Sequence, residues 1–246
     1  MSSKERITVW ILVLLVATIA GAIIALDHYS YEAADTDTTA IETEYGVSID
    51  RYGQGYTVAS DHPTTDTIGL VYYPGALVDP AAYLQTLAPI AAEKDVQIII
   101  PKMPLDLAII DINRADRIQS NYPMIETWIV GGHSLGGATA CRYVESSEAD
   151  GLLLHGSYCD VDISEQSISV LSVLGTEDQI INQEAERTGR ALLPPDATIV
   201  EIEGMTHAQF GSYGEQRGDG TATITNEDAR DRLTETTHQW LAEQFH

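Results

Sequence analysis

Short apolar runs alternate with amphipathic segments along most of this chain of 246 residues. Runs rich in Val, Ile and Leu predict strands at 47–51, 55–60, 68–73, 96–100, 126–130, 151–155, 168–174 and 198–203. Segments with helical periodicity lie between them, at 80–93, 106–119, 135–145, 183–192 and 227–243. Strands that are apolar along their whole length are covered on both faces, and alternation of strand and helix favours parallel pairing. The pattern therefore predicts an α/β fold with a mainly parallel, doubly covered sheet.

The run at 7–26 is of a different kind because it contains no charged side chain. At 1.5 Å of rise per residue it would span about 30 Å, the thickness of the hydrocarbon core of a bilayer. Lys4 and Arg6 precede it and acidic residues follow it, so the positive-inside rule places the N-terminus in the cytoplasm and the rest outside. A cleaved signal peptide is the alternative, but residues 22–25 form a poor cleavage site. We expect a transmembrane helix within 1–26 that anchors the protein in the cell membrane, with the lipid bilayer as a partner.

Residues 27–46 are polar and acidic, and they predict a tether between this anchor and one α/β domain at 47–246. The length of that domain suits a single sizeable core. Its first two strands are joined by a Gly-Gln-Gly turn and are expected to form a hairpin. No long insertion follows the strand at 151–155, where a lid would usually lie, so we expect an open or thinly covered site.

The charge balance is strongly acidic, with 37 Asp and Glu against 13 Lys and Arg, a net charge of −24 and an isoelectric point near 4.3. A surface of this charge repels nucleic acid and anionic lipid headgroups, so we expect neither to bind the domain. The composition resembles that of proteins from organisms that live in concentrated salt, where screening relieves the self-repulsion. An acidic protein from an ordinary environment is the alternative.

Two cysteines, Cys141 and Cys159, are too few for a disulfide framework or a zinc site of their own. They could pair in an oxidising compartment, but the favoured interpretation is two small buried apolar residues. We expect no metal ion and no organic cofactor.

Residues 132–136 read Gly-His-Ser-Leu-Gly and lie between the strand at 126–130 and the helix at 135–145. In this strand–turn–helix setting the flanking glycines leave room for the backbone, and Ser134 is held in a strained conformation with its hydroxyl presented at the edge of the sheet. The N–H groups that open the helix point at the same place. The motif predicts a nucleophilic serine, and a plain Gly-Ser turn is the alternative.

A nucleophilic serine needs a base, and the base needs an orienting carboxylate. Asp178 follows the strand at 168–174, and His207 follows the strand at 198–203. The order Ser…Asp…His is that of the nucleophile-elbow hydrolases. Asp178 is favoured over Glu177 by position; a turn or helix-cap role for Asp178 and a surface-loop role for His207 are the alternatives.

The predicted oxyanion hole consists of two backbone N–H groups. Leu135, next to the nucleophile, supplies one of them. The other is expected from Ala76, in the loop Pro74-Gly75-Ala76-Leu77 that follows the strand at 68–73. An ordinary Pro-Gly turn is the alternative for that loop.

Six stretches resemble an α/β-hydrolase family of the compact, nearly lidless kind related to dienelactone hydrolase: YYPGALVDPAAY, IIIPKMPLDLAI, GGHSLGGATA, LGTEDQ, EGMTHAQFGSYG and GDGTATIT. The resemblance covers residues 47 to 245 and implies a Ser134–Asp178–His207 triad with an oxyanion hole from Ala76 and Leu135. Many relatives have His-Gly where this chain has Pro-Gly, but a backbone donor should survive that change. Dienelactone hydrolases proper use a cysteine nucleophile, so their substrate is not transferred to this chain.

These observations predict a serine hydrolase, in first place a carboxylesterase that cleaves small or medium acyl esters through an acyl-enzyme at Ser134. A lipase and an amidase or peptidase fit the same residues, and so does a perhydrolase. A non-catalytic α/β-hydrolase domain that serves as a binding module is the alternative of a different class.

Overall fold

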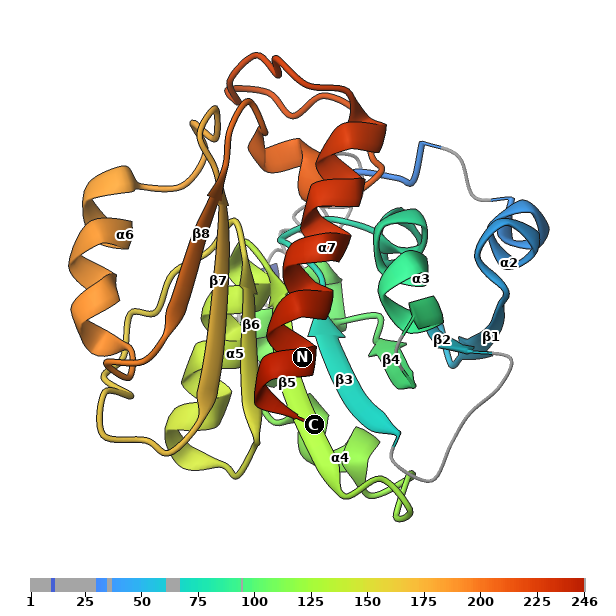
Figure 1. Ribbon diagram of the computed structural model, residues 1–246, viewed down its shortest axis with the longest axis horizontal. Helices are drawn as coiled ribbons and strands as arrows, with labels where there is room; N and C mark the ends of the chain where they lie inside the picture. The colour runs from blue at the N-terminus through green and yellow to red at the C-terminus, as the bar shows by residue number, and fades with distance from the viewer. Residues whose placement is uncertain (1–9, 12–29, 35–36, 61–66, 94, 246) are drawn as a thin grey trace.

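The computed structural model describes residues 10–11, 30–34, 37–60, 67–93 and 95–245. Within them, eight strands form one sheet in the order β1-β2-β4-β3-β5-β6-β7-β8 (Figure 1). The strands are β1 Val47–Tyr52, β2 Gly55–Ser60, β3 Ile68–Tyr73, β4 Val96–Ile100, β5 Thr127–His133, β6 Gly151–His155, β7 Ser169–Gly175 and β8 Thr198–Ile202. The first two pairings, β1 with β2 and β2 with β4, are antiparallel, and the others are parallel. The predicted α/β fold with a mainly parallel sheet is confirmed.

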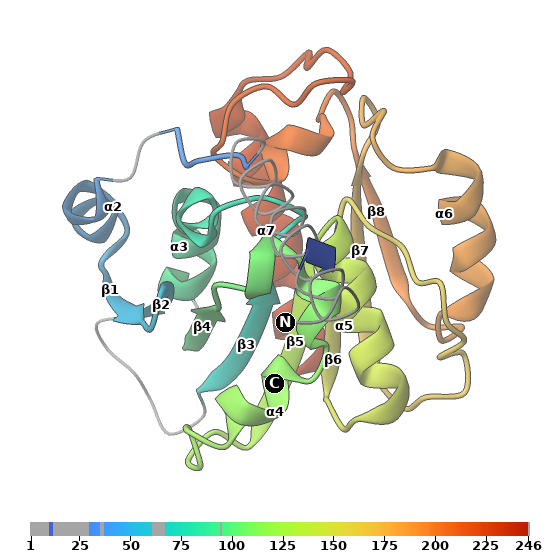
Figure 2. The same ribbon diagram turned by 180° about the vertical axis from the view of Figure 1, so that it is seen from behind.

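Helices cover both faces of this sheet. They are α2 Thr38–Tyr45, α3 Leu84–Glu93, α4 Arg114–Gln119, α5 Leu135–Ser146, α6 Gln183–Gly189 and α7 Asn226–Gln244. Figure 1 shows α3 and α7 in front of the strands, and the reverse view in Figure 2 shows α4 and α5 on the opposite face. The predicted helix at 80–93 begins as a 3-10 turn at Pro80–Tyr83, and the one at 183–192 ends as a 3-10 turn at Arg190–Leu192.

The core consists of two apolar layers, one on each face of the sheet. Alternate side chains of a strand point to opposite faces, so Leu70 and Tyr72 of β3 join the layer under α3 and α7. Their neighbours Val71 and Tyr73 join the layer under α4 and α5. Each such large apolar side chain contributes about 1.5–3 kcal/mol when it is fully buried. Burial on both faces explains why these strands are apolar along their whole length.

The predicted helix at 106–119 is wrong in its first half. Residues Pro104–Asp106 and Ala108–Asp111 form two short 3-10 turns, and only α4 is α-helical. Leu105 and Asp106 have positive φ angles of 53° and 56°, which no α-helix accommodates. The carbonyl of Asp106 instead accepts a hydrogen bond of 2.8 Å from the N–H of Leu77, so a tertiary contact fixes this loop.

The described part of the predicted tether at 27–46 also folds against the domain. Asp37 caps α2 through its side chain, Ile41 is buried, and α2 packs on α3. Tyr31 donates its N–H to the carbonyl of Leu77 at 2.6 Å. These residues are therefore part of the domain rather than a free spacer.

The predicted anchor within 1–26 lies outside the described residues, apart from 10–11. Among the residues that the structure describes, none of the helices is long and apolar enough to cross a membrane.

A disulfide joins Cys141 in α5 to Cys159 after β6, with 5.5 Å between the two Cα atoms. Both residues are buried, as expected, but the favoured interpretation of them as unpaired apolar residues is wrong. Because the bond closes a loop of 18 residues, we expect it to stabilise the folded state by about 3 kcal/mol.

Candidate active site

Ser134 lies at the sharp turn between β5 and α5. Its φ of 54° and ψ of −122° are strained for a residue with a side chain, a conformation that costs about 1–3 kcal/mol. Its N–H donates to the carbonyl of His155 at 3.0 Å, and the residue is partly exposed. A Cβ atom at Gly132 or Gly136 would lie 2.4 or 2.0 Å from the carbonyl oxygen of Tyr73. The two glycines are thus required by the close approach of β3 to the turn, as the sequence pattern predicts.

Asp178 and His207 form a buried pair. The Nδ1 of His207 lies 2.7 Å from Oδ2 of Asp178, and both side chains are almost fully buried. The other oxygen, Oδ1, accepts the N–H groups of Ile180 and Ile181 at 2.8 and 3.1 Å. Because a carboxylate only accepts, the proton of the imidazole is on Nδ1 and its Nε2 is left as a base. The structure therefore pairs the two residues that the sequence predicts as acid and base.

The order of the strands brings this pair to the serine. Ser134, Asp178 and His207 follow β5, β7 and β8, which are parallel and belong to one run of neighbouring strands, so all three lie at the carboxyl edge of the sheet. The imidazole of His207 lies 4.3 Å, between ring centroids, from that of His133, the residue that precedes the serine.

The loop after β3 turns tightly beside the serine. The N–H of Val78 donates to the carbonyl of Gly75 at 3.2 Å, and Leu77 inside the turn has a φ of 59°. A Cβ atom at Gly136 would lie 2.6 Å from the carbonyl oxygen of Pro74, so this loop packs on the first turn of α5. We call residues 75–78 the β3 turn.

Two N–H groups in the segments around the serine have no partner among the described residues. Among the described residues neither the N–H of Ala76 nor that of Leu135 has a hydrogen-bond acceptor. Leu135 is the first residue of α5, where N–H groups have no acceptor within the helix. Both of the residues that the sequence predicts as oxyanion donors thus carry an unoccupied amide.

Asp219 ties the two loops of the acid–base pair together, and the sequence reasoning missed it. One carboxylate oxygen accepts the N–H of Ala208 at 2.8 Å, and the other accepts those of Gln179 and Gly220 at 3.3 and 2.8 Å. Ala208 follows the histidine of the pair, and Gln179 follows its aspartate. The Gly-Asp-Gly of the GDGTATIT stretch was the available signal, because it marks a turn with a fixed acidic residue.

Two buried tyrosine–histidine pairs lie next to the segment that bears the serine, and sequence reasoning assigns them no role in the site. The hydroxyl of Tyr83 lies 3.0 Å from Nδ1 of His133, and that of Tyr72 lies 3.0 Å from Nδ1 of His155. Burial lowers the pKa of His133 well below its ordinary value, with smaller contributions from His207 and His155, and it lowers the pKa of His155 to about 3. Burial raises the pKa of both tyrosines. All four side chains are therefore neutral near pH 7.

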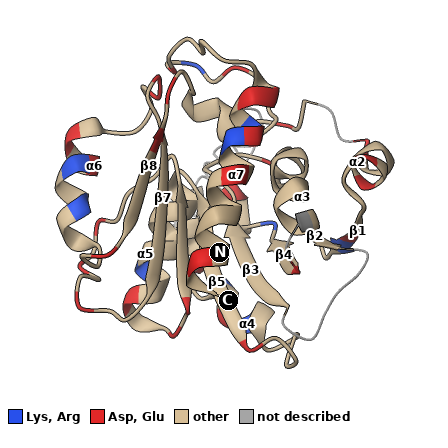
Figure 3. Cartoon of the chain, viewed as in Figure 1, with Lys and Arg blue, Asp and Glu red and all other residues tan. Residues whose placement is uncertain are grey.

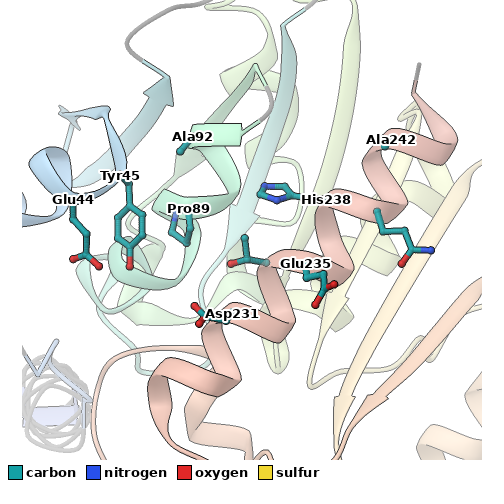
Figure 4. A pocket seen from close by; sticks show the side chains of 10 residues that line it. Glu44, Tyr45, Pro89, Ala92, Asp231, Glu235, His238 and Ala242 are labelled. Atoms are coloured by element: carbon teal, nitrogen blue, oxygen red, sulfur yellow. The ribbon is translucent and has the colours of Figure 1, made fainter.

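A groove of about 730 Å³ lies elsewhere on the molecule, between α2, α3 and α7. Figure 4 shows its lining, which includes Tyr45, Pro89, Asp231 and His238. None of the lining residues belongs to the serine turn, the acid–base pair or the β3 turn, so this groove is separate from the candidate active site. Among the described residues, no three His, Cys, Asp or Glu side chains are placed to hold a metal ion.

A strained serine at a strand–helix turn, followed by a buried Asp–His pair from later strands of the same parallel sheet, defines a protein of the nucleophile-elbow class. A model described as the alpha/beta hydrolase family matches residues 69–231. The chain therefore belongs to the α/β hydrolase family.

Several solved hydrolases have a similar fold. A serine hydrolase without a lid from Xanthomonas campestris is 13% identical, with a TM-score of 0.51 over 79% of this chain and 94% of that one. A thermophilic esterase from Thermogutta terrifontis with butyrate bound is 13% identical, with a TM-score of 0.53 over 80% and 94%. The esterase domain of a Rhodothermus marinus protein is 12% identical, with a TM-score of 0.55 over 81% and 98%. At such identities the likeness shows the fold alone, and no curated protein matches the chain.

Proposed function

We propose that this protein is a serine hydrolase, and specifically a carboxylesterase that cleaves small or medium acyl esters with Ser134, Asp178 and His207. The observation that carries the proposal is the 2.7 Å hydrogen bond between Asp178 and Nδ1 of His207, which makes Nε2 the basic nitrogen of the neutral imidazole at the same edge of the sheet as the strained serine. A binding module has no need of either feature.

The reaction follows from these positions. Nε2 of His207 takes the proton of the Ser134 hydroxyl as its oxygen attacks the ester carbonyl, and Asp178 stabilises the imidazolium that forms. The N–H groups of Ala76 and Leu135 bind the oxyanion of the tetrahedral intermediate. The imidazolium then protonates the leaving alcohol, which breaks the ester bond and leaves an acyl-enzyme. A water molecule, deprotonated by the same Nε2, releases the acid and restores the serine.

Small or medium esters are favoured because little chain is available to enclose a substrate. The segment that joins β6 to β7, residues 156–168, contains no helix among its described residues. The similar structures include a serine hydrolase without a lid and an esterase with butyrate bound, and we extend both properties to this chain as part of the proposal. A lipase or an amidase would use the same residues, so a substrate panel has to separate them.

Labelling with a fluorophosphonate tests the proposal directly. The domain from residue 27 onward should be labelled, at low or at high salt, and Ser134→Ala should abolish the labelling. The protein should hydrolyse p-nitrophenyl acetate and butyrate faster than the matching anilides. It should also hydrolyse these short esters faster than long-chain p-nitrophenyl esters. A folded domain that takes no label under either condition would refute the proposed activity and favour the binding module.

We also propose that the domain lies outside the cytoplasm, anchored by the uncharged run at 7–26. The disulfide between Cys141 and Cys159 supports this, because such bonds persist mainly in oxidising compartments. In the cartoon of Figure 3 the positions of Asp and Glu, in red, are spread over helices and loops with fewer Lys and Arg positions, in blue, between them, which supports an environment of high salt. Fractionation of cells that express the full chain, with protease added from outside, tests the placement.

A further inference from the structure

A chain of buried polar groups runs from the β3 turn to the residue before the serine. The N–H of Gly75, which begins the turn, donates to the hydroxyl of Tyr83 at 2.8 Å. The same hydroxyl lies 3.0 Å from Nδ1 of His133. Tyr83 and His133 are buried to 1% exposure or less, so no water competes for these bonds.

The direction of each hydrogen bond in this chain follows from the partners available to the Tyr83 hydroxyl. A tyrosine hydroxyl has one proton, and its oxygen already accepts the N–H of Gly75. Among the described residues, Nδ1 of His133 is the one acceptor in reach of the Tyr83 proton, so the hydroxyl donates to it and the imidazole proton is on Nε2. The low pKa of His133 and the raised pKa of Tyr83 agree with this neutral arrangement.

We propose that Tyr83 and His133 are positioning residues that set the oxyanion hole, by fixing the β3 turn to the segment that bears the nucleophile. The inference rests on the proposed function, since it assigns Ala76 and Leu135 to that hole. Ala76 directly follows the amide that Tyr83 binds, and Leu135 lies two residues after His133. The hydrogen-bonded pair thus connects the segment that carries Ala76 to the segment that carries Leu135.

The packing leaves little room for the turn to shift. A Cβ atom at Gly75 would lie 2.9 Å from Nδ1 of His133 and 3.1 Å from the hydroxyl of Tyr83. A displacement of about 1 Å in such a donor can cost about 100-fold in rate. Loss of the tyrosine hydroxyl leaves both the amide and the imidazole without a partner, so the turn is freed at its first residue.

The fold provides a matched control in Tyr72. Its hydroxyl also bonds to Nδ1 of a buried histidine, His155, at 3.0 Å, and its ring centroid lies 5.3 Å from that of Tyr83. Among the described residues, Tyr72 accepts no bond from the β3 turn. Tyr72→Phe therefore removes the same kind of bond from the same core without touching the oxyanion donors.

The test compares the wild type, Tyr83→Phe and Tyr72→Phe, each purified as the full chain, in the hydrolysis of p-nitrophenyl acetate. Both variants should show a similar fall in Tm. Only Tyr83→Phe should lower kcat, by about 100-fold, with KM within twofold of the wild type and a parallel fall in the rate of fluorophosphonate labelling. The pH at which kcat/KM is half-maximal should not move, because the Asp178–His207 bond is untouched.

Equal kcat values for the two variants would overturn the inference. If Tyr83→Phe does not fold, His133→Asn and His133→Leu decide instead, because an asparagine oxygen can replace Nδ1 as acceptor and leucine cannot. A faster Asn variant supports the inference and equal rates overturn it. A folded wild-type protein that neither hydrolyses esters nor takes the label would instead refute the proposed function, so the two failures are distinguishable.

Discussion

The two sides of the serine are held in opposite ways. On the acid–base side, after β7 and β8, backbone N–H groups fix charged side chains: Asp178 and Asp219 each accept two or more of them. On the oxyanion side, neutral side chains fix the backbone: Tyr83 and His133 hold the β3 turn through Gly75. Charged groups are thus held by the backbone on one side of the serine, and the backbone is held by neutral groups on the other.

This difference follows from what each side has to do in the proposed reaction. His207 must gain and lose a proton, so its partner has to keep a charge and an orientation through the cycle, and rigid amides serve that purpose. The amide of Ala76 must stay free and fixed, so the groups around it should not change charge. Neutral partners with strongly shifted pKa values meet that need.

The largest expected effect is on the acid–base side, from Asp178→Asn. The oxygen of the amide should stay with the N–H groups of Ile180 and Ile181, which turns its NH2 group toward Nδ1 of His207. The imidazole then moves its proton to Nε2 and is no longer a base, so kcat for p-nitrophenyl acetate should fall by about 10⁴.

Glu177→Gln is the matched control for that substitution, because Glu177 is the neighbouring carboxylate and lies partly exposed. It should retain a kcat within threefold of the wild type. A large fall in kcat for Glu177→Gln, together with a small fall for Asp178→Asn, would assign the orienting role to Glu177 and contradict the account of the acid–base side given above.

A smaller effect is expected from Asp219→Asn. The carboxylate accepts N–H groups on both oxygens, and an amide has only one acceptor, so either Ala208 or Gln179 would face an NH2 group. The two loops of the acid–base pair should loosen, and kcat should fall about tenfold, which is about 1.4 kcal/mol. The downfield proton resonance of the Asp178–His207 bond should broaden or shift in parallel.

Asp228→Asn provides the control for the lost charge. Asp228 caps α7 together with Thr225 and is exposed, so its replacement removes one negative charge without touching the site. Equal kcat values for the Asp219 and Asp228 variants would show that the loops are held by other contacts.

The sequence predicts the sheet well because each strand can be recognised from the residues within it. The strands β2, β3, β4 and β6 begin and end where the apolar runs do. Burial on both faces favours apolar residues at most positions of these strands, so each strand can be recognised from its own residues. Ser134, Asp178 and His207 can be predicted for a similar reason, because each of them follows the end of a predicted strand.

What the sequence did not predict depends on contacts between distant residues. Nothing local marks Leu105 and Asp106 as left-handed, because their conformation is fixed by the bond from Leu77. Tyr83 lies in a 3-10 turn 50 residues before its partner His133, and apolar periodicity treats it as a core residue. Tyr83 is indeed a core residue, but its hydroxyl also bonds to Gly75 and His133, and a pattern of apolar positions cannot show those bonds.

The last expected effect is on stability rather than on rate, and it tests whether the buried histidine His155 stays neutral in the folded protein. Burial lowers the pKa of His155 to about 3, from an unfolded value near 6.5. Between these values the unfolded chain binds a proton that the folded chain does not, so stability falls as the pH falls below about 6.5, and the loss continues to about pH 3. His155→Asn can keep an acceptor for Tyr72 but cannot titrate. Between pH 7.5 and 5.5 the wild type should lose about 1.4 kcal/mol more free energy of unfolding than this variant, measured with urea. Identical pH dependences would mean that His155 is not kept neutral by the fold.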